Sequence, residues 1–238
     1  MKWRMLRLDW KYALGELIIV TAGVLIALGV DEWRQGINDD EMELAYIARI
    51  KSDLREDIER YEDFINVPLR NKRIILESLQ LLDPDNLEYD YSIFTTANLR
   101  YSTYKAIPEV QSGTFREMTN AGNFRLISDQ ELRMKIDGYY ENYQLMAGIL
   151  QQSPGNYERL LSASLPGKPF YISFVEEMEM PQESIRTGIM ALLLQPELNE
   201  SVNTELYYAA SMTYWMRDIS NRAKDLLNSI EQNYSQLN

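Results

Sequence analysis

Carboxylates and lysines are the main side chains that this sequence offers for chemistry, because it contains neither histidine nor cysteine. Histidine is the commonest general acid–base group and transition-metal ligand, so its absence excludes histidine-based catalytic triads and His-ligated zinc sites. The absence of cysteine excludes disulfides, thiolate nucleophiles and cysteine-based metal sites. Carboxylate or lysine chemistry remains possible.

The acidic clusters do not have the spacing of a catalytic or metal site. Asp39-Asp40-Glu41 and Asp83-Pro84-Asp85 raise the question of calcium. The second run lacks the central glycine and final glutamate of an EF-hand loop, and Leu87 stands where an oxygen ligand is needed. Glu176 and Glu177 are adjacent, and nothing fixes a carboxylate separation suited to glycoside hydrolysis. We interpret the runs as solvated helix ends and predict no enzyme, catalytic residue, metal or cofactor.

The clearest signal in the chain is an apolar segment near its start. Residues 13–30 read ALGELIIVTAGVLIALGV, with Glu16 as the single charge. A helix needs about 20 mostly apolar residues to cross a bilayer. Trp10 and Tyr12 precede the segment and Trp33 follows it, and Trp10 and Trp33 lie roughly 35 Å apart along a helix. Because aromatic residues mark both membrane interfaces, we predict a transmembrane helix over residues 12–33.

Charge around this segment predicts its orientation. Residues 1–11 form a short basic tail, whereas the first twenty residues after Val30 hold two basic and six acidic residues. The positive-inside rule then places the tail in the cytoplasm. The large domain, residues 34–238, would be extracytoplasmic, in the periplasm if the source is a Gram-negative bacterium with the span in its inner membrane.

Two other interpretations of the segment stay open. Ala27-Leu28-Gly29 resembles a signal-peptide cleavage site, which would make the segment a removed targeting signal. A buried helix of a soluble protein would also be apolar. The charge at Glu16 is unusual for a signal peptide, and the basic flank and aromatic ends favour a membrane span over a soluble core helix.

Small residues within the span predict helix–helix packing. Gly15, Ala22 and Gly29 recur every seven residues, and Gly23 with Ala27 forms a small-xxx-small pair. Glu16 falls on the same side as Gly23, and a carboxylate facing lipid is costly. We expect self-association or a membrane-protein partner. The alternative is that Glu16 sits near the headgroups and the glycines reflect ordinary membrane-helix composition.

The rest of the chain shows the period of helices rather than strands. Apolar stripes with steps of three or four predict helices near residues 44–65, 69–82, 112–120, 132–150, 182–194 and 201–236. Pro68 should kink or break the first run, and only Tyr171–Val175 has a weak strand pattern. We predict an all-α fold in which the transmembrane helix continues into an antiparallel helical bundle.

Helix-end signals support these boundaries. Asn120-Ala121-Gly122-Asn123 is typical of a helix C-terminus, where glycine takes the left-handed conformation. Ser128-Asp129-Gln130-Glu131 has the pattern of a capping box, with Ser128 as the capping residue.

The outer domain is acidic and rich in tyrosine. Residues 31–238 hold 20 basic and 34 acidic residues, a net charge of −14, so nucleic acid is an unsuitable partner. The chain has 16 tyrosines, clustered at 89–104 and 139–143. They could line a ligand pocket or a protein interface, or they could pack at the rim of the bundle with exposed hydroxyls.

The membrane segment resembles a family of bacterial single-pass membrane proteins that is catalogued as a domain of unknown function. The resemblance rests on Gly15-Glu16, on Gly23-Val24-Leu25-Ile26-Ala27-Leu28 and on Trp33. It extends to Thr114–Met118, Gly122–Ile127 and Leu132–Tyr140, which look like the family's central helix–turn–helix. The resemblance implies a membrane-anchored helical protein without assigned activity, and it carries over no catalytic residue.

Two functions of different kinds follow as hypotheses. The first is a non-enzymatic, membrane-anchored interaction or scaffold protein that contacts the lipid bilayer and either itself or another membrane protein. The second is a periplasmic sensor-type bundle whose tyrosine-lined interior holds a small solute. The short basic tail has no room for an output domain, so the second hypothesis needs a partner to transmit a signal.

Overall fold

The computed structural model describes residues 10–83, 89–150, 156–165 and 179–235, and within them it contains helices and connecting segments but no strand. The α-helices are α1 (Trp10–Phe64), α2 (Arg70–Leu81), α3 (Thr96–Ser102), α4 (Gly113–Asn120), α5 (Gln130–Leu150), α6 (Asn156–Ser164), α7 (Gln182–Leu193) and α8 (Leu198–Asn233). The all-α prediction is confirmed. The weak strand pattern Tyr171–Val175 and the pair Glu176 and Glu177 lie outside the described residues.

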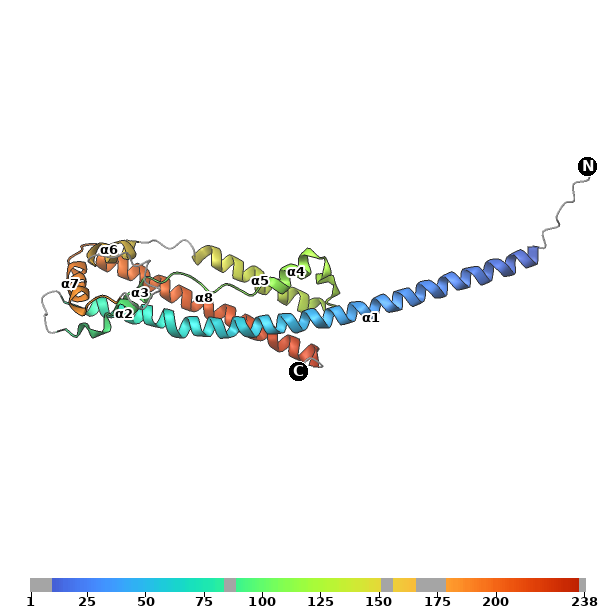
Figure 1. Cartoon of the computed structure of the whole chain (residues 1–238), viewed down its shortest axis with the longest axis horizontal. Coiled ribbons are helices and arrows are strands. Elements are labelled where there is room, and N and C mark those ends of the chain that lie inside the picture. The colour runs from blue at the N-terminus through green and yellow to red at the C-terminus, as the bar shows by residue number, and fades with distance from the viewer. Residues whose placement is uncertain (1–9, 84–88, 151–155, 166–178, 236–238) are drawn as a thin grey trace, which may run out of the picture.

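Helix α1 has 55 residues and would be about 80 Å long. Its first buried residue is Glu43, and the part before it projects from the bundle as a single rod (Figure 1). The break considered at Pro68 does not occur. A π-helical turn, Ile65–Leu69, contains this proline and joins α1 directly to α2. A π turn shifts the backbone hydrogen bonds by one residue, so the helix tolerates the missing proline N–H without ending.

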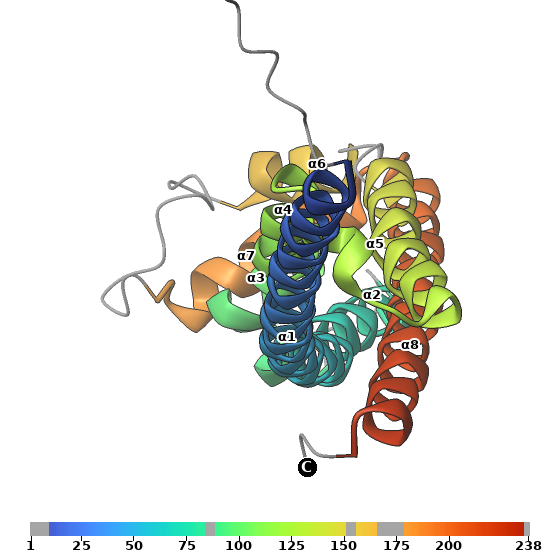
Figure 2. The same ribbon diagram turned by 90° about the vertical axis from the view of Figure 1, so that its right-hand side faces the viewer.

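Two long rods form the frame of the bundle. One is α1 with α2, and the other is α8, which runs antiparallel to it. Ion pairs link Lys51 to Glu231 at 3.4 Å and Glu62 to Lys224 at 2.5 Å, so residue numbers rise on one rod as they fall on the other. Viewed along the rod, α5 and α8 lie together beside α1 (Figure 2).

Helix α5 runs in the same direction as α1. Near its start Ser128 bonds to Glu43, and farther along Tyr139 bonds to Asp57. The bundle is therefore antiparallel between α8 and the other two long helices, but parallel between α1 and α5. An extended segment, residues 104–112, carries the chain back along the bundle before α4 and α5 and so makes this arrangement possible (Figure 1).

Two apolar clusters share these rods. The cluster nearer the projecting end contains the predicted faces of α1 and α5, with residues such as Ile50, Leu54 and Ile136 fully buried. The farther cluster joins α2, α3, α6, α7 and the first part of α8, with Phe94 and Leu161 at its centre. Burial of these stripes, rather than helix propensity, holds the elements in place.

Helix ends follow the sequence signals with one exception. Gly122 takes the left-handed conformation, with φ of 71°, as predicted for a helix C-terminus. The predicted capping role of Ser128 is wrong. The Asp129 carboxylate accepts from the backbone N–H groups of Glu131 and Leu132, so Asp129 caps α5. Ser128 instead donates both its backbone N–H and its hydroxyl to buried Glu43, which competes for it.

A close helix contact at Gly188 supplies a test of this packing. A Cβ added at Gly188 in α7 would lie 2.5 Å from Leu165 Cδ2 and 3.2 Å from Leu165 Cα. We expect Gly188→Ala to cost about 1–3 kcal/mol in the free energy of unfolding, because overpacking moves a buried neighbour. The matched control is Gly138→Ala in α5, where no atom lies within 4 Å and alanine should add up to about 1 kcal/mol.

Urea unfolding of the full chain in detergent, followed by far-ultraviolet circular dichroism, measures both variants. Equal stabilities for the two would show that α7 does not pack against Leu165 as described.

Candidate functional site

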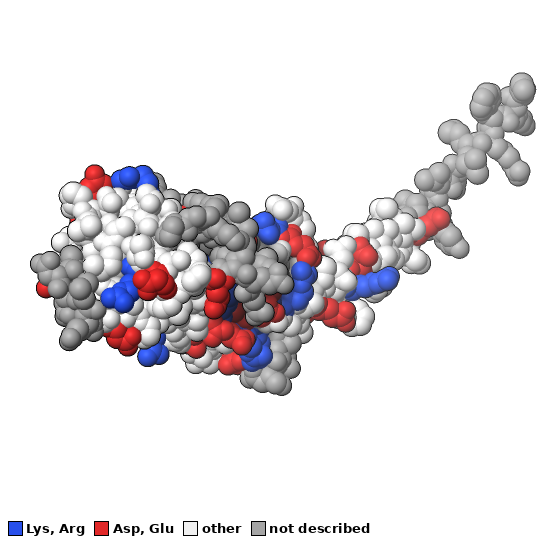
Figure 3. Space-filling view, turned by 60° about the vertical axis from the view of Figure 1, so that its left-hand side comes forward, with Lys and Arg blue, Asp and Glu red and all other residues white. Residues whose placement is uncertain are grey.

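The predicted membrane segment is not covered by any other part of the described chain. From Leu14 to Val30 every large apolar side chain is exposed, Leu14 at 47% and Ile19 at 74%. By length and composition this helix could cross a membrane. Figure 3 shows the projecting rod as mostly uncharged, with charged side chains gathered where it leaves the bundle. Apolar surface on this scale is unfavourable in contact with water and is common where a protein meets a membrane or a partner.

The predicted packing residues lie on this uncovered rod. Helical geometry places them on two neighbouring stripes that together span roughly 160° of the helix surface. One stripe holds Gly15, Ala22 and Gly29, and the other holds Glu16, Gly23 and Ala27. No atom lies within 4 Å of a Cβ built at Gly15, Gly23 or Gly29, so a neighbouring helix could approach all three.

The predicted interface anchors are only partly described. Trp33 lies on the rod with 69% of its surface exposed. Trp10 lies at the first residue of α1 and Tyr12 in its first turn. The side chains of both lie outside what the structure describes.

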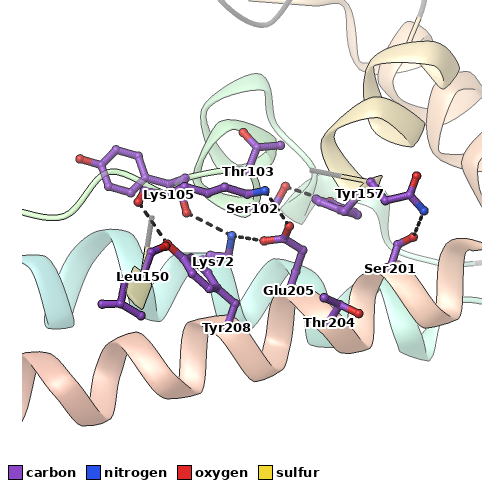
Figure 4. Close-up of polar contacts among 12 residues, drawn as sticks. Lys72, Ser102, Thr103, Lys105, Leu150, Tyr157, Ser201, Thr204, Glu205 and Tyr208 are labelled. Atoms are coloured by element: carbon purple, nitrogen blue, oxygen red, sulfur yellow. Dashed lines mark hydrogen bonds and ion pairs between the residues drawn. The ribbon is translucent and has the colours of Figure 1, made fainter. Parts of the chain in front are cut away.

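A buried ion pair lies between the two apolar clusters (Figure 4). Lys72 Nζ in α2 donates to Glu205 Oε2 in α8 at 2.6 Å, and the two side chains are 0% and 1% exposed. Lys105 Nζ lies 3.1 Å from the other Glu205 oxygen. Burial lowers the pKa of Lys72, while the Glu205 carboxylate acts in the opposite direction. The attraction between the two charges offsets the cost of removing them from water. The pair joins the two long rods at the centre of the bundle.

The extended segment 104–112, here called the strap, is held by side chains rather than by a sheet or helix. Lys72 Nζ donates to the Tyr104 carbonyl at 3.1 Å, and Arg60 Nη1 donates to the Glu109 carbonyl at 2.9 Å. Tyrosine hydroxyls hold three more carbonyls: Tyr208 that of Lys105, Tyr143 that of Pro108 and Tyr140 that of Gln111. A segment without regular structure can be half-buried only when its backbone groups are satisfied in this way.

These contacts revise the interpretation of the tyrosines. Packing at the rim with exposed hydroxyls is wrong for Tyr61, Tyr139, Tyr140 and Tyr157, which are at most 2% exposed. Their hydroxyls bond inside the protein, for example Tyr157 with Ser102 at 2.9 Å. Burial raises the pKa of all four phenols. They therefore act as neutral hydrogen-bonding groups that fill the interior and do not line a solute cavity.

Asp57 in α1 is a fully buried carboxylate that is hydrogen-bonded by two other segments of the chain. Its oxygens accept from the backbone N–H of Gln111 at 2.9 Å and from the Tyr139 hydroxyl at 2.8 Å. Tyr139 in turn contacts the Tyr61 hydroxyl at 3.2 Å. Burial raises the pKa of Asp57 to about 6, against the opposing effect of these hydrogen bonds. The carboxylate ties α1, the strap and α5 together, and the neighbouring Asp53, one turn earlier in α1, adds to the raised pKa.

A cavity of about 730 Å³ opens beside the strap. Its walls come from the strap itself, from Arg60 of α1, from the start of α4 and from α5 between Tyr143 and Leu150. Three cations, Arg60, Lys105 and Arg116, face one acid, Glu109, in this lining. Its volume lies within the range of small-molecule sites.

The remaining acidic clusters form no metal site in the part of the chain that the structure describes. No group of three or more carboxylates is close enough there to hold an ion. Asp39, Asp40 and Glu41 are solvent-accessible, but the prediction that they form a helix end is wrong, because α1 runs through them without a break from Trp10 to Phe64. Pro84 and Asp85 fall outside the described residues.

The functional residues that the sequence did not reveal are charged residues at apolar stripe positions. Lys72 stands in the stripe Leu69, Leu76 and Leu79, and Glu205 stands between Val202 and Ala209. A charge at such a position on each of two helices is a signal for a buried pair. The strap and cavity give no such periodic signal.

Comparison of the sequence with known protein families gives a match. Residues 16–157 match a family of unknown function, DUF6090, and this match covers α1 from Glu16 onward, α2 to α5, the strap and the start of α6. A search of the curated proteins and of the solved structures found no match. Because the matched residues make up more than half of the chain, the protein belongs to DUF6090, a family of unknown function.

Proposed function

We propose that this protein is a non-enzymatic, single-pass membrane protein that presents an acidic helical bundle as an interaction module. The observation that carries the proposal is the apolar rod of α1, residues 14–30, which is long enough for a bilayer and touches no other described part of the chain. A soluble core helix would bury this surface. The bilayer is the first partner, and nucleic acid is disfavoured by the charge of the outer domain.

The proposed location is the inner membrane of a bacterium, with residues 1–11 in the cytoplasm and residues 34–238 on the periplasmic side. Support comes from the basic tail before the rod and the acidic residues that follow it. Trp33 would mark the outer interface. Glu43, the first buried residue, would then hold the bundle about 15 Å beyond it.

The second part of the proposal is association within the membrane, with another copy or with a different membrane protein. The stripes of Gly15, Ala22 and Gly29 and of Glu16, Gly23 and Ala27 allow close backbone approach. Pairing also removes Glu16 from lipid, where its charge would be unfavourable. The role of the bundle would be to bring its surface to that partner at a fixed height above the membrane.

A substitution in the second stripe tests association. Gly23→Leu should reduce cross-linked multimers of the full chain in detergent by about fivefold, because a large side chain separates the helices and costs about 1 kcal/mol. Val24→Leu is the control, since position 24 lies about 100° around the helix from Gly23 and outside both stripes, so it should leave the yield unchanged. A monodisperse monomer at every concentration would exclude self-association.

Membrane insertion has its own test, independent of association. The intact chain should stay in vesicles through an alkaline carbonate wash, and external protease should cut its C-terminal part in spheroplasts. Release by carbonate would exclude the span, and protection of the C-terminal part would reverse the proposed orientation.

A further inference from the structure

The cavity beside the strap has the size of a small-molecule site. Its volume of about 730 Å³ lies within the usual range of roughly 300–1,000 Å³ for ligand pockets. It is bounded by segments far apart in sequence, α1, the strap, α4 and α5, so only the folded chain forms it. The hydrogen bonds from Arg60, Tyr140 and Tyr143 fix the strap along one side. A ligand would therefore meet a prearranged wall rather than a loose loop.

The charge of the lining is opposite to that of the domain. Arg60, Lys105 and Arg116 against Glu109 give a net charge of +2, whereas residues 34–238 as a whole have a net charge of −12. Arg60 is half-buried, and its closest carboxylate oxygen, Glu56 Oε2, is 3.9 Å away. Arg116 donates to the Ser112 carbonyl at 3.4 Å, and no carboxylate of the described chain forms an ion pair with it. Both guanidiniums keep capacity for an anion.

The rest of the lining is apolar or uncharged. Ile107 and Val110 of the strap face the cavity together with Ala147 and Leu150 of α5. Gln144 adds an amide that can donate or accept. Such walls suit a carbon skeleton and favour an organic anion over an inorganic one.

We propose that this cavity binds a small organic dianion, with its charged groups at Arg60 and Arg116 and its carbon skeleton against Ile107 and Ala147. Dicarboxylates and phosphate monoesters share this chemistry. The ligand is a soluble molecule rather than a lipid headgroup, because Arg60 lies 27 residues beyond Trp33, about 40 Å along α1. The inference goes beyond the proposed membrane function and would stand if the chain proved to be monomeric.

Isothermal titration of the full chain in detergent tests the proposal. The probes are succinate and glycerol phosphate, each compared with a neutral analogue, succinamide or glycerol, at ionic strength matched with sodium chloride. At least one dianion should give saturable binding at millimolar concentration or below, and the neutral analogues should not. The dianion that binds identifies carboxylate or phosphate as the recognised group.

Two variants and one control test whether the dianion binds in this cavity. Arg60→Gln and Arg116→Gln should each weaken binding by about tenfold, because each removes a charge-assisted contact. Arg116 is exposed, and among the described residues its side chain bonds only to the Ser112 carbonyl one turn earlier, so its variant keeps the test valid if Arg60→Gln disturbs the strap. Arg73→Gln, on the surface of α2 and paired with Glu77, should leave the affinity unchanged.

Three results would overturn the proposal. They are no saturable binding of either dianion, equal binding of the neutral analogues, and unchanged affinity in both Arg60→Gln and Arg116→Gln.

Discussion

Glu205→Gln is expected to lower the free energy of unfolding by about 3–5 kcal/mol, the cost of removing one partner of a buried ion pair. The substitution keeps the shape of the side chain but leaves Lys72 fully buried without its counter-charge. Lys72 could still donate to the Tyr104 carbonyl and to the amide oxygen of the new glutamine, but neither acceptor carries a charge. Lys72 can limit the loss by releasing its proton, which at neutral pH sets a ceiling of about 5 kcal/mol. Urea unfolding of the full chain in detergent measures the change.

The exposed pair Arg73–Glu77 provides the matched control for this substitution. Glu77→Gln makes the same chemical change in a pair whose side chains are half exposed, and it should cost less than about 1 kcal/mol. The double variant Lys72→Met with Glu205→Leu should recover most of the lost stability, since two apolar side chains would join the neighbouring cores. A Glu205→Gln variant as stable as Glu77→Gln would show that the pair is not buried.

Asp57→Asn should abolish a pH dependence of stability between about pH 4 and 6. The pKa of Asp57 is raised by burial from 3.8 to about 6. Folding therefore favours the protonated carboxyl, and its contribution to stability is complete below pH 4 and lost as the pH rises through 6. The loss is on the order of 3 kcal/mol. Asparagine can accept from Gln111 and donate toward Tyr139, so the variant should be at least as stable as the parent at pH 7.

Denaturant unfolding at a series of pH values, with parent and variant compared at each, isolates the contribution of this one group. Asp63→Asn, at an exposed position of the same helix, is the control and should keep the slope of the parent. Parallel curves for Asp57→Asn and the parent would contradict the raised pKa.

The long helices could be predicted from sequence because each buries one continuous stripe. All six residues of the α5 stripe are buried: Leu132, Ile136, Tyr139, Tyr143, Met146 and Leu150. Helix ends depended on local signals, and those succeeded where no distant group interfered, as at Gly122. At Ser128 the prediction failed because Glu43, 85 residues earlier, attracts the same donor. At Pro68 the helix does not break, because a π turn accommodates the proline that a regular helix excludes, so of the predicted kink or break only the break is wrong.

The candidate site was less accessible to sequence reasoning. Short helices such as α3 and α6 have only two turns or so, too few for a period to stand out. The strap has no period at all, because its backbone partners are side chains from four distant helices. The cavity follows from the path of the strap. The part of the site that the sequence could have indicated is the set of charged residues at apolar stripe positions: Asp57, Lys72 and Glu205.

The unbroken course of α1 has a consequence for how neighbouring molecules would meet. One helix supplies both the apolar rod and a wall of the core, and no loop between Trp33 and Glu43 allows swivelling. A partner helix that packs against the Gly23 side of the rod would therefore also fix the rotation of the whole bundle about the α1 axis. Inserting a single residue in this stretch would turn the bundle by about 100° and raise it by about 1.5 Å. If two copies associate as proposed, the number of residues in this stretch, more than their chemical nature, would determine which outer surfaces the copies present to each other.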